Sequence, residues 1–332
     1  MTAPTLTRAR ADARHRPLLA SRSRAVLGAV AQRLLGAAAV LLGAATVAFV
    51  ALQLIPGDPV TVMLGPGNPA TPQLRARIRA EYGLDHPVAQ QYLHYLGRLL
   101  HGDLGESYQL QQPVAHVIAG QLWPTVQLAV LAMGFALVLA LTAAVTTAGR
   151  RRAARAAVQL AELLSVSSPP YWIGIVLLTL FSFHWRLFPV AGADGFAALV
   201  LPALTLALPL AGVLGQVLRE GLETALGQPF AVTARARGLS DTAVRLRHAL
   251  RHATTALVTL TGWLTGSLLG GAVLVEAVFA RPGIGALTLQ ATTNKDMPLV
   301  VGVVLLSASV FVVISTLVDL LYLLIDPRLR RG

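Results

Sequence analysis

The strongest constraint on the fold is a series of long apolar runs, each about long enough to cross a bilayer. The first, from Leu34 to Ile55, has only Thr46 and Gln53 as polar side chains. A spanning helix needs about 20 such residues, because the hydrocarbon core is roughly 30 Å thick and a helix rises about 1.5 Å per residue. A soluble α/β protein would instead need apolar runs of strand length separated by turns. The sequence therefore predicts an all-α, polytopic membrane protein.

Six such runs divide the chain. The first is too long for the core of a cleaved signal peptide, so we expect it to remain as a helix. The third is interrupted at Pro169 and Pro170, where the freed backbone carbonyls need partners inside the protein. The predicted spans are 34–55, 125–148, 163–183, 196–218, 254–279 and 299–325. The segments between and beyond them are an arginine-rich tail (1–33), of which residues 1–24 are expected to be disordered, an aqueous loop (56–122), a polar stretch (219–253), a second loop (281–298) and a C-terminal segment (326–332).

The positions of the basic residues predict the orientation. Of 27 Lys and Arg residues, 20 fall in segments 1–33, 149–157, 219–251 and 326–332, and seven fall on the opposite side. Because short cytoplasmic loops retain positive charge, we expect both termini and the 219–253 stretch in the cytoplasm. This topology accounts for the net charge of +12 and argues against a nucleic-acid partner.

The 56–122 loop carries its own helix signals. Thr71 and Pro72 can start one helix, a second begins near Pro87, and a third short helix starts at Pro113. We expect a folded extracytoplasmic cap whose apolar stripes cover the spans or one another. The stripe of the second helix consists of Val88, Tyr92, Tyr95 and Leu99.

The polar stretch between the fourth and fifth spans has an ordered pattern. Residues 229–256 read PFAVTARARGLSDTAVRLRHALRHATTA. Pro229 can begin a short helix that Gly238 ends, and Ser240 with Asp241 can cap a second helix. A helix lying on anionic headgroups and a docking surface for a soluble partner both fit this pattern. On the second helix one face is predicted to carry Ala243, Leu246 and Leu250, and the opposite face Arg245, His248 and His252; the two histidines lack a third nearby metal ligand.

Two patches in this stretch, TARARGLS and RLRHALRHA, resemble the cytoplasmic loop of ABC-importer permeases of the dipeptide, oligopeptide and nickel class. Further patches resemble the same family in the same order, over nearly the whole chain from Leu34 onward. They are PGDP (56–59), YGLDHPVAQQY (82–92), GDLGES (102–107), WPTVQLA (123–129), LFPVAG (187–192), VEAVFARPGIG (275–285) and VDLLYLLIDPRLR (318–330).

The resemblance implies the type I ABC-importer permease fold, with six transmembrane helices and the cap between the first two. It implies a first, B-type permease in the bacterial cytoplasmic membrane that moves di- or oligopeptides, or else nickel or another small solute. The implied partners are a second homologous permease, two ATPases that bind ATP and Mg, and an extracytoplasmic binding protein. The residues themselves agree on one point: the sole lysine, Lys295, follows Asn294, so the chain has no GxxxxGK[ST] nucleotide loop, and no cofactor or metal is expected in it.

The resemblance also implies that the 219–253 stretch couples the spans to the ATPases. Val232, His252 and Ala256 depart from the usual family pattern, which leaves the detailed contacts of this loop open. The implied coupling residues are Phe230, Thr233, Ala234, Arg235, Arg237, Gly238, Leu239, Arg247 and His248.

Small and ionisable residues inside the spans are further candidates. Two overlapping GxxxG units in the fifth span allow close helix packing, alone or along the substrate route. The acidic residues lie near span ends, where we expect them to be solvated, and Glu276 can pair with Arg281. A proton-coupled transporter would need a chain of such groups, and a hydrolase would need a His or Asp near Ser267. The candidate residues are Gly262, Gly266, Gly270, Ser267, Glu162, Glu276 and Asp319.

Overall fold

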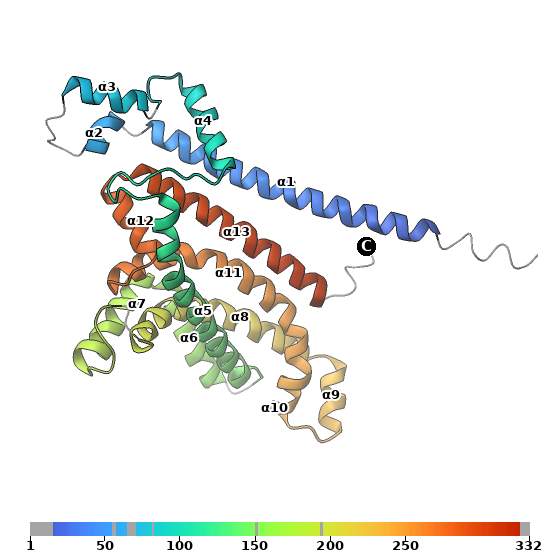
Figure 1. The fold of residues 1–332 in the computed structure, drawn as a ribbon. Helices are drawn as coiled ribbons and strands as arrows, with labels where there is room; N and C mark the ends of the chain where they lie inside the picture. Colours follow the sequence, from blue (N-terminus) through green and yellow to red (C-terminus); the bar gives the residue numbers. More distant parts are fainter. Residues whose placement is uncertain are drawn as a thin grey trace, which may run out of the picture.

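The computed structural model describes residues 16–54, 58–64, 71–81, 83–149, 152–192 and 195–325, and within these ranges helices joined by short loops make up the chain (Figure 1). A single isolated bridge joins Glu106 to Pro113. The first half contains α1 (Arg16–Leu54), α2 (Pro59–Leu64), α3 (Pro72–Glu81), α4 (Val88–Leu100), α5 (Val114–Thr147), α6 (Arg152–Ser167), α7 (Pro170–Leu177) and the π-helical η2 (Leu178–His184). The second half contains α8 (Ala197–Leu226), α9 (Pro229–Ala236), α10 (Asp241–Val244), the π-helical η3 (Arg245–Ala249), α11 (Leu250–Val278), α12 (Ile284–Thr293) and α13 (Met297–Ile325).

Four described helices are long and apolar enough to cross a membrane, and the number rises to six if each of two bent pairs counts as one span. One bent pair is α6 with α7 and η2, which turns by 111°. Its break lies at Ser168 and Pro169, where the sequence predicted an interruption. The other bend, of 54°, lies within α11 near Gly270.

Three predicted boundaries differ from the observed helices because hydropathy marks the apolar part of a helix and misses its polar extensions. α1 begins at Arg16, so residues 16–24 of the segment expected to be disordered are helical, as is the rest of the arginine-rich tail up to the first span. The short helix predicted at Pro113 is the first part of α5, which continues through Pro124. Before the predicted third span, α6 already begins at Arg152. The predicted segments 1–15 and 326–332 lie outside the described residues.

The helix α8 organises the core of the bundle. It buries side chains along its whole length, from Ala198 to Ala225. The largest apolar cluster joins α5, α8 and α11 through residues such as Leu128, Leu214 and Leu268. Figure 1 shows α2, α3 and α4 at one end of α1, with α9 and α10 at the far end of the bundle. The cap helices α2–α4 and the α9–α10 segment, the two regions expected to meet partners, therefore lie at opposite ends of the protein (Figure 1).

Candidate functional site

The segment from Pro229 to Val244 forms a helical hairpin made of α9, a turn and α10. Gly238 has φ +83°, a conformation that side-chain-bearing residues avoid, and its N–H donates to the carbonyl of Arg235 at 2.9 Å. The Ser240 hydroxyl accepts from the Ala243 N–H at 3.3 Å and caps α10. The predicted helix, glycine exit and capped restart are confirmed.

The helical hairpin has a buried side and an open side. Ala231 and Ala234 pack against Val244, with Phe230 and Leu239 beside them. Three predicted coupling residues, Phe230, Ala234 and Leu239, therefore hold the hairpin together. The open side carries Thr233, Arg235, Arg237 and Gly238, together with Val232. Arg235 is fixed there by Asp241, whose Oδ1 accepts from Nε at 3.0 Å.

The predicted faces of the second helix are wrong. Leu246 is 46% exposed, whereas Arg245 is buried with Val244 and Ala249. The cause is η3, because a π-helical turn contains more residues than an α-helical turn and rotates the following side chains. Arg247 and His248 remain exposed. Both residues therefore stay available to a partner.

A groove of about 570 Å³ lies between the helical hairpin and the two long helices behind it. Its walls include Glu220 and Thr224 of α8, Phe230 of α9, and His252 and Ala256 of α11. The Phe230 and His252 rings stack with centroids 4.8 Å apart. His252 thus anchors α9 to α11. Among the described residues, no three His, Cys, Asp or Glu side chains gather to hold a metal ion.

A buried ion pair joins three helices close to the helical hairpin. The Arg219 guanidinium of α8 pairs with Glu162 of α6, and its Nε donates to Thr147 Oγ1 of α5 at 2.8 Å. Glu162 and Arg219 are both buried, so the expectation that Glu162 is solvated is wrong. We call Glu162 and Arg219 the inner ion pair. A second α6–α8 contact, Arg155 Nη1 to Glu223 Oε1 at 2.9 Å, is partly exposed and is called the outer ion pair.

A second buried carboxylate, Glu276 of α11, lies at the other end of the bundle. It is fully buried, so its predicted solvation is also wrong. Oε1 accepts from the Thr125 hydroxyl at 2.7 Å, and Oε2 accepts from the N–H of Ala286 at 3.0 Å. Thr125 Oγ1 accepts in turn from the Ile284 N–H at 2.8 Å. Glu276 and Thr125 together satisfy the first N–H groups of α12.

Arg281 does not form the expected ion pair with Glu276. Its side chain is buried, and Nε and Nη1 have no hydrogen-bond partner among the described residues. Burial lowers the pKa of Arg281 from its ordinary value, although the nearby Glu276 charge opposes this. Glu276 is therefore held by neutral donors.

The other candidate residues predicted inside the spans differ in what surrounds them. A Cβ on Gly262 would collide with Val318 of α13, and one on Gly266 would lie 3.4 Å from Phe311. Gly270 has open space around it and takes no part in this packing. Within the described part of the chain, the Ser267 hydroxyl donates to the carbonyl of Leu264 in its own helix and to no other group. The side chain of Asp319 lies outside the described residues.

The cap helix α4 packs its aromatic stripe on α1. Phe49 lies 5.2 Å from the Tyr92 ring and 5.6 Å from the Tyr95 ring, measured between centroids. The Tyr92 hydroxyl is 2.6 Å from Thr46 Oγ1. Burial, with a smaller contribution from Tyr92, raises the pKa of Tyr95 to about 12. This contact fixes α4 on the first span.

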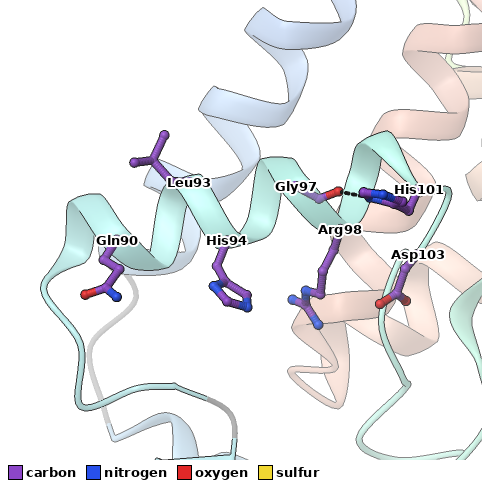
Figure 2. A pocket seen from close by; sticks show the side chains of 7 residues that line it. All are labelled: Gln90, Leu93, His94, Gly97, Arg98, His101 and Asp103. Atoms are coloured by element: carbon purple, nitrogen blue, oxygen red, sulfur yellow. Dashed lines mark hydrogen bonds between the residues drawn. The ribbon is translucent and has the colours of Figure 1, made fainter.

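The opposite side of α4 is open. Figure 2 shows Gln90, His94 and Arg98 projecting from α4 on the same side of the helix, with Asp103 beside Arg98. Together with Leu93, Gly97 and His101 they line a shallow pocket of about 420 Å³. This side of α4 is accessible and carries the polar side chains of Gln90, His94 and Arg98 (Figure 2).

A third buried carboxylate, Asp296, fixes the cap to the start of α13. Asp296 accepts from the Ser107 hydroxyl and from the N–H groups of Tyr108 at 3.2 Å and Gln109 at 3.3 Å. The GDLGES patch is therefore tied to the connection between α12 and α13.

Four residues have structural roles that the sequence did not predict: Arg219, Thr125, Thr147 and Asp296. Arg219 was counted only as a cytoplasmic charge, because it directly follows the predicted fourth span and precedes Glu220. The two threonines looked like ordinary span residues. Their roles depend on charged side chains that are distant in sequence, Glu276 for Thr125 and Arg219 for Thr147.

The chain resembles known ABC-transporter proteins in both its fold and its sequence. The fold resembles the inward-facing MetNI methionine ABC transporter with a TM-score of 0.53 at 16% identity, over 63% of this chain and 96% of that one. The sequence matches the family described as binding-protein-dependent transport system inner membrane component over residues 136–331, and the N-terminal part of such membrane components over residues 26–129. The chain belongs to this family of ABC-importer permeases.

Curated relatives are similar over almost their full length. A putative peptide transport system permease of Brucella abortus (strain 2308) is 37% identical over 91% of this chain and 98% of its own. The Escherichia coli K12 dipeptide permease DppB is 36% identical, covering 87% and 94% respectively. The Salmonella choleraesuis glutathione permease GsiC is 36% identical, covering 92% and 99%.

Family membership settles several expectations. The chain is a multi-pass inner-membrane permease subunit of a binding-protein-dependent ABC importer. Such permeases are non-catalytic and work with ATPase partners and binding proteins. No cofactor is expected in this chain.

Proposed function

We propose that this chain is the B-type permease of an importer for di- and oligopeptides, and that it works by alternating access. The relatives named above are described as peptide, dipeptide and glutathione permeases, and all three cargoes are peptides. The second permease of the importer is a homologous chain. Cargo enters from an extracytoplasmic binding protein and leaves into the cytoplasm.

The proposed topology has six spans and both termini in the cytoplasm. Each bent helix pair counts as one span, which adds two spans to the four continuous ones. An even number of spans puts the two termini on the same side. Arginine is abundant in the segments that follow α5, α8 and α13 in the chain, which supports placing these segments, and with them both termini, on the cytoplasmic side. The cap is then extracytoplasmic, and we propose the polar side of α4 as part of the surface that receives the binding protein.

The helical hairpin is the proposed docking site for an ATPase. The observation that carries this proposal is the turn at Gly238, which presents Arg235, Arg237 and Thr233 on one open side of a buried base. Arg247 and His248 extend the exposed surface. A hairpin seated on an ATPase would convert closure of the ATPase pair into movement of α8 and α11.

Gly238→Pro tests this docking. Proline fixes φ near −65°, which is incompatible with the φ of +83°, and removes the N–H that bonds to Arg235. We expect the variant to insert normally but to lose co-purifying ATPase and Mg·ATP-driven uptake of radiolabelled L-alanyl-L-alanine in proteoliposomes.

Gly102→Pro is the matched control. Gly102 also follows a helix, with φ +77° and an N–H bonded three residues back, to Leu99 at 3.0 Å, but it lies at the cap. This variant should retain its ATPase. Wild-type uptake by Gly238→Pro, or energised uptake by a preparation without ATPase, would refute the proposal.

A further inference from the structure

We propose that the inner ion pair is a positioning device that makes α6 move together with the end of α8, and so carries displacement of the helical hairpin to the bent α6–α7 segment. This inference rests on the proposed docking of an ATPase on the hairpin. It assigns a role in transport to Glu162 and Arg219 beyond that of stabilising the fold.

The first step is the closeness of α6 and α8. A Cβ on Gly212 would lie 2.9 Å from the carbonyl oxygen of Glu162, and one on Gly215 would lie 2.7 Å from Glu162 Oε1. Glycine at these positions lets the α8 backbone approach the acidic side chain. The outer ion pair lies nearer the start of α6 and the end of α8, so the two helices are antiparallel and joined at two levels.

The second step is the continuity of α8 with the helical hairpin. Two residues, Gly227 and Gln228, separate the end of α8 from the start of α9. Leu226 and Phe230 pack in both the cluster inside the hairpin and the cluster at the end of α8. A force on α9 therefore reaches the turns of α8 that carry Arg219.

The third step is the connection from α6 onward. The break at Ser168 and Pro169 turns the chain by 111° between α6 and α7. Any shift of α6 along α8 would thus relocate α7, which packs on α8 and α11. The ion pair prevents independent sliding, because separating two buried charges is far more costly than moving apolar side chains past one another.

Stability and positioning can be separated experimentally. A buried ion pair can often be replaced by an uncharged pair of similar volume with little loss of stability. Glu162→Gln with Arg219→Met removes the charges but retains the approximate shape of both side chains. If the pair only stabilised the fold, this double variant would transport normally.

The absence of cysteine from the chain allows a direct test by distance measurement. Leu160→Cys on α6 and Leu246→Cys in η3, both exposed, would carry nitroxide labels in the importer purified with its ATPases. Pulsed electron paramagnetic resonance would compare the nucleotide-free complex with the complex trapped by Mg·ATP and vanadate. With the inner ion pair intact, we expect one distance peak with the same mean in both states.

In the Glu162→Gln/Arg219→Met background we expect the peak to broaden and its mean to change on trapping. Uptake of L-alanyl-L-alanine per ATP hydrolysed should fall roughly 2- to 30-fold, the range over which residues in a coupled network alter coupling. Unchanged distances and unchanged uptake per ATP would overturn the inference. If the double variant does not assemble, Glu162→Asp gives the same test with a smaller change, because it keeps both charges but shortens the reach of the carboxylate towards Arg219.

A failure of the proposed function gives a different result. If the wild-type chain does not retain its ATPases, docking on the hairpin is wrong. If the ATPases are retained but the α6–η3 distance peak is the same with and without the inner ion pair, only the positioning role is wrong. A matched control in the outer ion pair, Arg155→Gln with Glu223→Gln, should leave the distance peak and the uptake ratio near wild type because that pair is partly exposed.

Discussion

Glu162 and Glu276 are both buried acids in the helix bundle, but they have different kinds of partners. Glu162 faces a guanidinium, Arg219, on a neighbouring helix. Glu276 faces the hydroxyl of Thr125 and backbone N–H groups at the start of α12. The first arrangement joins helices that we propose to move together. The second satisfies the first N–H groups of α12, and neutral hydrogen-bonding groups are enough to hold the Glu276 carboxylate there.

The difference predicts how each site responds to substitution. Removing one member of an ion pair leaves an uncompensated buried charge, whereas removing a neutral donor leaves only unsatisfied hydrogen-bonding groups. The inner ion pair should therefore be more sensitive to single substitutions and more tolerant of a double one.

The largest effect is expected for Arg219→Met. It leaves Glu162 charged and buried without its cation, which costs about 3–5 kcal/mol of stability. The double variant Glu162→Gln/Arg219→Met should recover most of this loss. Unfolding of the purified chain in mild detergent measures both variants. A double variant as unstable as the single one would show that lost packing, and not the unpaired charge, causes the effect.

An intermediate effect is expected for Thr125→Val. The change keeps the side-chain volume but removes the donor to Glu276 and the acceptor for the Ile284 N–H, at a cost of about 1–3 kcal/mol. Thr142→Val is the matched control in the same helix, since the exposed Thr142 hydroxyl bonds only to the carbonyl of Val138. The same detergent unfolding assay compares the two. Equal stability of both variants would contradict the role assigned to Thr125 in holding α12.

The smallest effect is expected in the outer ion pair. Arg155→Gln should lower stability by less than about 1 kcal/mol, because both partners are partly exposed to water and screened by salt. The measurement is again unfolding, repeated at low and high salt. A loss comparable to that of Arg219→Met would mean that burial does not distinguish the two α6–α8 contacts.

Much of the architecture was predictable from local patterns. Apolar runs located the spans, Pro169 and Pro170 located the break, and Pro229, Gly238 and Ser240 located the helical hairpin. These signals work because they depend on residues close together in sequence. The faces of the helix after Ser240 were not predicted, because the π-helical turn η3 changes the spacing of the following side chains and the local apolar pattern does not mark it.

The sequence by itself determined that the chain is a helical membrane protein and that a glycine turn divides the polar 219–253 stretch into two helices. Only the tertiary structure decided which buried acid has a cation beside it. Glu162 and Arg219 are 57 residues apart, and Glu276 and Thr125 are 151 apart. The physical reason is that the environment of a buried charge is set by side chains brought together when distant helices pack, and no local pattern records those neighbours.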